Sequence, residues 1–179
     1  MQKEYTISLF TENKAGLLMR VVQVFTRRHI NIESLTTSQS SIAGIFRFTI
    51  VVNVLPEMVE KLVAQLDKQV EVIKAFHYER HEIVYNEIAL YKVPTAAFAN
   101  NDRIETLVRK YNARILTIEP EYTVIEKTGH QAETEGLLNE LREIGIYEFV
   151  RSGRVAITKP MEMLNTYLKS LDMADGVWQ

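Results

Sequence analysis

The sequence predicts an α+β protein made of two ferredoxin-like βαββαβ domains, and three observations lead to this prediction. Segments typical of strand, helix, strand, strand, helix and strand follow one another in the first half, and the same order returns in the second half. The 179 residues are 46% hydrophobic and 25% charged, which suits a soluble globular chain of one domain or two small ones. Each domain is therefore expected to have an antiparallel sheet with both helices on one face.

The first half opens with a β-prone segment at 5–10, in which Ile7 and Leu9 lie on one face of a strand. Residues 13–16 break this pattern, and from Leu17 the apolar residues recur at helical spacing. The other elements expected here, in order, are the basic last turn of that helix at Arg27, Arg28 and His29, a strand at 30–37, a turn at 38–44, a strand at 45–54, a helix opened by Pro56, and a strand at 70–78.

The second half repeats this order after a linker expected at 80–86, so the predicted domains are 1–79 and 87–158. Apolar residues at helical spacing after Lys159 predict an amphipathic helix in the tail, 159–179, packed on the body or on a partner. The elements expected in the second domain are a strand at 87–93, a helix that begins near the capping cluster Asn100, Asn101 and Asp102, strands at 113–118 and 122–126, a helix carrying Leu137, Leu138, Leu141 and Ile144, and a strand at 146–150.

A single layer of helices on each sheet has a consequence for assembly. The other face and the edges of each sheet are left open, and exposed strand edges are usually paired or covered in native proteins. Domains this small also gain stability by association. The sequence therefore predicts an oligomer.

Composition and charge exclude several function classes. The chain has no cysteine, which excludes a disulfide scaffold, a cysteine-ligated metal site and a thiol nucleophile. With 21 basic and 23 acidic side chains the net charge is -2, so nonspecific binding of nucleic acid has no global electrostatic source. No apolar run approaches the ~18 residues that a membrane span needs, and no basic and then apolar leader opens the chain. We therefore expect no nucleic acid or membrane partner, and a cytoplasmic location.

Two polar clusters have simpler interpretations than a functional site. His77 and His81 lie four residues apart, but strand and linker periodicity would not bring them together as metal ligands, so we interpret them as solvated linker residues. The basic cluster 27–29 lacks the aromatic and basic pattern of RNA-binding strands, which favours a solvated helix end. Motifs for a serine nucleophile or for phosphate binding do not occur. The residues thus predict neither a catalytic site nor a metal site.

The turn between the first strand and the first helix, residues 11–18, is the most informative segment. Free N–H groups at a helix N-terminus suit a carboxylate, and Gly16 lets a ligand approach closely because it has no Cβ. Asn13 and Asn31 each carry an amide that can donate and accept hydrogen bonds, as recognition of a free amino acid requires. Chemistry alone leaves two interpretations equally open: an effector site, or a turn in which Asn13 is only a cap and Gly16 only relieves strain.

The sequence around this turn resembles a known family. The segment ENKAGLLMRVVQVFTRRHINIESLT is similar to the start of the ACT-domain regulatory (small) subunit of acetolactate synthase. The likeness continues through EIALYKV, through EPEYTVIEKTG and to the RSG segment at 151–153, so it covers residues 1–158. The chain departs from the family at His29 and Ile30, where members commonly have Gly and an aromatic residue, and in its longer tail from Pro160. The matched positions of the turn region are Glu12, Asn13, Gly16, Leu18, Asn31, Ile32, Glu33, Ser34 and Leu35.

The resemblance implies a non-catalytic protein that binds the catalytic (large) subunit of acetolactate synthase, raises its activity and confers feedback inhibition by a branched-chain amino acid, usually valine. Thiamine diphosphate, magnesium and FAD are then expected only on the catalytic subunit, and no cofactor on this chain. It also implies a homodimer through the ACT domains, with the effector at their interface. The residues expected around the effector are Asn13, Ala15, Gly16, Leu17, Leu18, Asn31 and Ile32.

Two other function classes stay open at this stage. A stand-alone ACT-type sensor of amino acids that controls another enzyme or transcription would need, for transcription, a DNA-binding element, and the sequence has no helix-turn-helix pattern or basic stripe. A small ferredoxin-like enzyme would need a converging acid, base or nucleophile, which the sequence does not show. Co-purification of a large thiamine-diphosphate enzyme, of DNA, or of nothing would separate the three classes.

Overall fold

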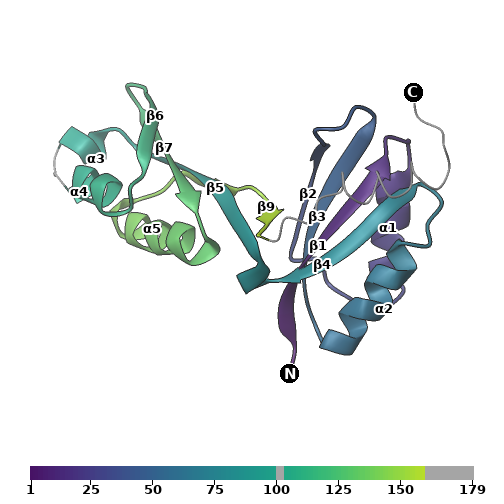
Figure 1. The fold of residues 1–179 in the computed structure, drawn as a ribbon. Helices are drawn as coiled ribbons and strands as arrows, with labels where there is room; N and C mark the ends of the chain where they lie inside the picture. The colour runs from purple at the N-terminus through teal and green to yellow at the C-terminus, as the bar shows by residue number, and fades with distance from the viewer. Residues whose placement is uncertain (100–102, 160–179) are drawn as a thin grey trace.

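The first 79 residues form a four-stranded antiparallel sheet with two helices on one face (Figure 1). The structure is a computed structural model that describes residues 1–99 and 103–159. The strand order is β2-β3-β1-β4, which is the arrangement expected for a βαββαβ unit. The elements of this unit are β1 (Lys3–Glu12), α1 (Leu17–Thr26), β2 (Ser34–Gln39), β3 (Ile45–Val54), α2 (Pro56–Leu66) and β4 (Val72–Glu79).

The second half repeats this topology, with the strand order β6-β7-β5-β8 and an added strand, β9, paired with the start of β5. Two antiparallel βαββαβ units are therefore present, which confirms the predicted fold class. The elements are η1 (Arg80–Glu82), β5 (Ile83–Pro94), α3 (Ala96–Ala99), α4 (Arg103–Lys110), β6 (Arg114–Ile118), β7 (Tyr122–Gly129), α5 (Gln131–Ile144), β8 (Glu148–Arg151) and β9 (Val155–Thr158).

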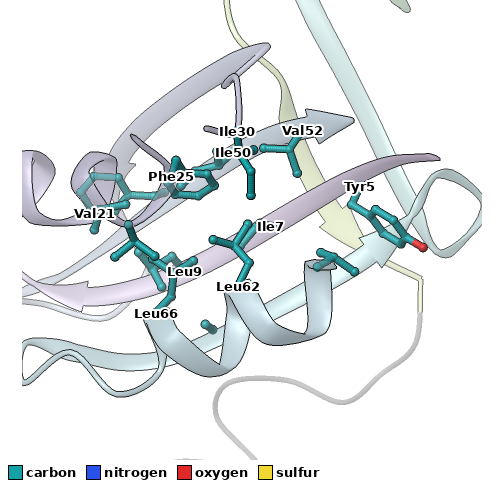
Figure 2. Packing of buried hydrophobic residues seen from close by; sticks show 14 of the residues in the cluster. Tyr5, Ile7, Leu9, Val21, Phe25, Ile30, Ile50, Val52, Leu62 and Leu66 are labelled. Carbon is teal, nitrogen blue, oxygen red and sulfur yellow. The ribbon is translucent and has the colours of Figure 1, made fainter. Parts of the chain in front are cut away.

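Each unit has its own hydrophobic core between its sheet and its helices. Figure 2 shows Ile7 and Leu9 of β1 packed beside Phe25 of α1 and Leu62 of α2. In the second unit, Tyr91 of β5 is fully buried, and its hydroxyl donates a hydrogen bond to Thr134 O at 2.7 Å. Burial raises the pKa of this hydroxyl, so it stays a donor at ordinary pH. Both cores follow the apolar stripes of the sequence.

The linker expected at 80–86 is corrected by the structure. The segment is regular: η1 is followed directly by β5, and residues 83–86 pair with β9 in register from Ile83↔Thr158 to Asn86↔Val155. Ile83 and Tyr85 are buried in a small third cluster with Ala156. Neither β9 nor the short helix α3 was expected. The division into domains at residue 79 stays a prediction.

The end of the first helix is also corrected. Helix α1 ends at Thr26, so the basic cluster 27–29 lies beyond its last turn. The backbone of His29 has a φ of 54°, and the N–H of Ile30 donates to Phe25 O at 3.1 Å. This pattern is a Schellman motif, which stops a helix by a left-handed residue. Strand β2 then begins at Ser34 instead of Ile30, and its pairing with β3 starts at Ser34↔Val51.

Two predictions fall on residues outside the described part of the chain. The capping cluster at 100–102 precedes α4, which is described from Arg103 onward. The amphipathic helix expected in the tail is described only at Lys159. There the N–H of Lys159 donates to Glu82 O at 2.8 Å, which fixes the end of β9 beside η1.

Candidate functional site

The turn from β1 into α1 has an open, left-handed glycine at the helix N-terminus. Gly16 has a φ of 81°, and no described atom lies within 4 Å of the position where a Cβ would be. No side chain of the described residues caps α1, so N–H groups of its first turn are not satisfied by a cap. A left-handed residue next to free N–H groups leaves room and partial positive charge for a small anion.

The charged residues around this turn pair with each other. Lys14 Nζ lies 2.6 Å from Glu12 Oε2, and the hydrogen bond to this carboxylate raises the pKa of Lys14. Arg20 Nη1 lies 2.6 Å from Glu71 Oε1, at the start of the segment that leads into β4. The turn therefore carries no net excess of charge from its own side chains, and the helix N-terminus is the remaining source of attraction for a carboxylate.

The predicted effector residues of the turn do not all face solvent. Asn13, Ala15 and Gly16 are exposed, and Leu18 is 44% exposed. Leu17 is different, because it is only 3% exposed and belongs to the hydrophobic core of the first unit. The exposed members thus include both a polar amide, at Asn13, and apolar side chains, at Ala15 and Leu18, which are the two kinds of contact that an aliphatic amino acid requires.

Asn31 and Ile32 lie in the loop between α1 and β2. Asn31 is exposed, whereas Ile32 is partly buried and packs against the core of the first unit. This loop follows the C-terminal end of α1, whereas the glycine turn precedes its N-terminal end. The two halves of the predicted site therefore lie at opposite ends of the helix.

The strand register confirms this separation. Val51 of β3 lies between Thr6 of β1 and Ser34 of β2, so the start of β2 is level with the beginning of β1. The glycine turn follows Glu12, which is six residues further along β1. Six residues of strand span roughly 20 Å. Within one chain, the amides of Asn13 and Asn31 thus cannot bind the same free amino acid.

The edge of the first sheet next to these residues is open. Strand β2 is at the end of the order β2-β3-β1-β4, and no described strand pairs with its outer side. On helix α1, which makes the crossover from β1 to β2, Leu18 is 44% and Met19 is 66% exposed. An unpaired edge strand and exposed apolar side chains in the same unit are both typical of a surface that meets another chain.

The other candidate clusters have structural explanations. His77 lies on β4 and meets the ring of Tyr5 edge-on at 5.9 Å, and His81 in η1 is 3.7 Å from Glu79. Arg28 donates to Gln65 Oε1 at 2.8 Å. Within residues 1–99 and 103–159, no group of three or more histidine or acidic side chains is arranged to hold a metal ion, and no helix is long and apolar enough to cross a membrane.

Sequence reasoning missed the residues that join the two units. Arg154, between β8 and β9, is 2% exposed and contacts β1 of the first unit. The same segment lines a polar cleft of about 500 Å³ between the units, together with Glu33, Ser34, Glu87 and Arg151. The only signal in the sequence was the family likeness of residues 151–153, which indicated no contact.

Family comparisons match both halves of the chain. Residues 7–74 match the family described as the AHAS small subunit-like ACT domain, and residues 86–160 match the small subunit of acetolactate synthase. The acetolactate synthase small subunit of Bacillus subtilis is 35% identical over 154 residues, which is 86% of this chain and 89% of that protein. The small subunit of Mycolicibacterium smegmatis is 36% identical over 155 residues, covering 87% and 91% of the two chains.

A solved structure agrees with these matches. The crystal structure of the acetolactate synthase small subunit from Thermotoga maritima has a TM-score of 0.81 and 30% sequence identity, over 88% of this chain and 98% of that one. The fold, the sequence identity and both family matches thus agree, and the chain belongs to the family of acetolactate synthase small subunits.

Proposed function

We propose that this chain activates the catalytic subunit of an acetolactate synthase and makes its activity sensitive to feedback inhibition by a branched-chain amino acid, with valine as the first candidate. As a small subunit, it is the regulatory and not the catalytic chain. The condensation of 2-oxoacids then takes place on the partner, which carries thiamine diphosphate, magnesium and FAD. This chain binds none of these cofactors and contributes regulation from the cytoplasm.

The observation that carries this proposal is the position of Asn13 and Asn31 at opposite ends of α1. A two-fold dimer places one end of a helix beside the opposite end of its partner's helix when the two helices run antiparallel. Pairing of two β2 edges gives such a dimer, because the edge is open and α1, which connects β1 to β2 across β3, belongs to the β2 side of the sheet. Each effector site then takes its glycine turn and Asn13 from one chain and Asn31 from the other.

The chemistry of such a shared site suits valine, leucine or isoleucine. The uncapped N-terminus of α1 binds the carboxylate, and the two amides bind the polar groups. The exposed apolar residues Ala15 and Leu18 and the half-buried Ile32 contact the aliphatic side chain. Because the ligand touches both chains, binding changes their relative arrangement, and this change reaches the catalytic subunit.

The first experiment is a titration of the reconstituted enzyme with valine, leucine and isoleucine, using variants of this chain. Asn13→Ala and Asn31→Ala each remove hydrogen bonds to a charged ligand, worth roughly 1.5 to 3 kcal/mol, so the affinity is expected to fall about ten-fold or more. Gly16→Asp is expected to act more strongly, because it puts a negative charge where the carboxylate binds. Gln23→Ala, an exposed amide in the middle of α1, is the matched control.

A mixing experiment then tests whether two chains share the site. Coexpression of Asn13→Ala with Asn31→Ala gives mixed dimers, and in each of these one site loses both amides while the other keeps both. Inhibition at parental effector concentrations is therefore expected to return in the mixed dimer, although it is lost in each homodimer. A mixed dimer as resistant as the two homodimers would contradict the shared site. Unchanged inhibition in all three single variants would place the effector elsewhere.

A further inference from the structure

In Figure 1, β9 lies on the side of the first sheet where β2 is, and the segment between β8 and β9 contacts this edge strand closely. A Cβ at Gly153 would collide with Thr36 Oγ1 and would come within 2.9 Å of Ser34 Oγ. The backbone N–H of Arg154 donates to the same Ser34 Oγ at 3.0 Å. The second unit thus contacts β2 so closely that only a glycine fits at position 153 without a shift.

The side chain of Arg154 continues this contact onto the open face of the sheet. Its Nη1 donates to Thr6 Oγ1 at 2.8 Å and lies 2.9 Å from Glu4 Oε1. The guanidinium carbon is 4.0 Å from the centre of the Tyr85 ring, which belongs to the second unit. Arg154 is only 2% exposed, and the cost of burying its charge is offset by these partners.

The location of this contact connects it to the proposed effector site. Ser34 and Thr36 belong to β2, the open edge strand, and Ser34 follows Asn31 after only two residues. A ligand held by Asn31 at a dimer interface acts on the start of β2, which is where Gly153 and Arg154 contact it. A rigid contact at this point passes any movement of β2 to β5, β8 and β9.

We propose that Gly153 and Arg154 form the noncovalent link through which the effector-binding unit is coupled to the second domain. Arg154 is a positioning residue in this scheme: it does not touch the effector, but it holds β2 to the second domain. The assignment of a signal to this link rests on the proposed function. The link itself is a property of the chain alone and is measurable without an effector or a catalytic subunit.

The first test uses the full chain with Arg154→Met, which keeps an unbranched side chain and removes the guanidinium. Hydrogen exchange of the β2 amides at 34–39 is expected to rise about ten-fold or more, because the strand loses its support from the second domain. Arg109→Met, at an 83% exposed side chain on α4, is the control and is expected to leave this exchange unchanged. Exchange at β2 that stays parental in Arg154→Met would overturn the proposal.

The second test separates binding of the effector from the response to it. The Arg154→Met chain is expected to bind valine with a dissociation constant within about three-fold of the parent, because none of its changed atoms belongs to the effector site. In the reconstituted enzyme, however, the valine concentration for half inhibition is expected to rise at least about five-fold, the lower end of typical allosteric coupling. Parental inhibition by valine in this variant would overturn the proposal.

A disulfide then provides a rescue that a merely structural role does not predict. The chain has no cysteine, so Ser34→Cys with Gly153→Cys makes a single pair across the link, and Thr36→Ala removes the collision at position 153. In the Arg154→Met background the oxidised pair is expected to restore inhibition, and a reducing agent is expected to remove it again. The Thr36→Ala variant alone is the control.

The remaining outcomes are also decisive. The same cysteine pair can also be oxidised in a chain that retains Arg154. If this oxidation abolished inhibition by valine, the contact would have to open during inhibition, and the proposal of a rigid link would be overturned. If the parent chain binds no branched-chain amino acid, the proposed function fails and the signal assigned to the link fails with it. In that case, hydrogen exchange of the β2 amides in the Arg154→Met chain still decides whether the link between the domains exists.

Discussion

The two domains share one topology but differ in the connection between their first strand and first helix. In the first domain, four residues after β1 lead through the left-handed Gly16 into the uncapped helix α1. In the second domain, Thr95 and the short helix α3 follow β5 instead. Sheet order is thus the same in both, whereas only the first domain has the open glycine turn. A fold therefore repeats more easily than a site, because a site depends on a few residues of one loop.

The open faces of the two sheets also differ. In the first sheet, Thr6 and Ser8 are buried polar residues, and Arg154 and Arg47 donate hydrogen bonds to them from the open side. Burial lowers the pKa of the Arg47 guanidinium, which nevertheless stays protonated at ordinary pH. The second sheet instead exposes apolar residues on this face, where Ile88 is 47%, Leu90 37% and Val150 54% exposed. The first domain therefore uses its open face within the chain, and the second domain leaves an apolar strip in solvent.

The largest difference in stability is expected from a cavity made in the hydrophobic core of either domain. Leu62 of α2 and Leu137 of α5 are both fully buried at equivalent positions of the two domains. Replacement of either by Ala is expected to lower the free energy of unfolding by about 2 to 5 kcal/mol, because a buried leucine loses its contacts and leaves a cavity. Urea denaturation followed by circular dichroism measures this change.

The control for both leucine variants is Val70→Ala, since Val70 is 92% exposed and its replacement is expected to change stability by less than about 0.5 kcal/mol. Equal losses in a single transition would show that the domains unfold together. If Leu137→Ala left the main transition unchanged while a second transition moved, the domains would be independent. A loss below about 1 kcal/mol in either variant would contradict the assignment of that leucine to a rigid core.

Much of the fold was predictable because its signals are local. The alternation of Ile7 and Leu9 and the helical spacing after Leu17 identify strand and helix without knowledge of the partners. The pairing of Ile83 with Thr158 was not predictable in this way, because its partner strand lies far along the chain and charged residues flank the segment. Long-range pairing thus changed an expected linker into a strand.

The site was predictable in its parts but not in its arrangement. Gly16 and Asn13 were recognisable from the chemistry of a turn at a helix N-terminus, and both lie within the residues that match the ACT-domain family. The position of Asn31 at the far end of α1 depends on the register of β2, which sequence periodicity does not give. Arg154 was missed because a single arginine in a loop is normally solvated, and its burial arises only when two domains meet.

An effect of intermediate size is expected at the C-terminal ends of α1 and α4, where the two domains are again similar. Helix α4 ends like α1, because Asn112 has a φ of 49° and the N–H of Ala113 donates to Val108 O at 2.8 Å. Both left-handed positions lack glycine, the residue that suits them best. His29→Gly is expected to raise the free energy of unfolding by about 1 kcal/mol, since a side chain in this region is strained.

Asn112→Gly provides the matched comparison to His29→Gly. Asparagine adopts the left-handed conformation more readily than histidine, so Asn112→Gly is expected to gain only a few tenths of a kcal/mol. His29→Asn is expected to lie between the parent and His29→Gly. Thermal and urea unfolding of the three variants measure the order. A gain for Asn112→Gly that exceeds the gain for His29→Gly would contradict the role of backbone strain at His29.

The smallest expected effect concerns the helix N-termini and their response to pH. Helix α1 has no cap among the described residues, whereas at α5 the carboxylate of Glu133 accepts a hydrogen bond from the N–H of His130 at 2.7 Å. This bond, more than the nearby Lys127, lowers the pKa of Glu133 below its ordinary value. A carboxylate whose pKa is lowered by folding stabilises the protein above the unfolded pKa of about 4.3, and this contribution is lost as the pH falls through the folded pKa.

Glu133→Gln separates the charge from the hydrogen bond, because glutamine keeps an acceptor at this position. Glu133 is half exposed, so solvent screens its charge, and the variant is expected to lose only about 0.5 kcal/mol at pH 7. This difference from the parent is expected to shrink as the pH falls below the ordinary range of glutamate, when the parent's carboxylate becomes protonated as well. Urea denaturation at pH 7, 5, 4 and 3 measures the difference. The control is Glu105→Gln on α4, because the carboxylate of Glu105 lies 3.8 Å from Arg109 in an exposed ion pair and not in a hydrogen-bonded cap. A difference that grows with acidification would have the wrong sign, and the stabilisation of α5 would then not come from an ionised cap.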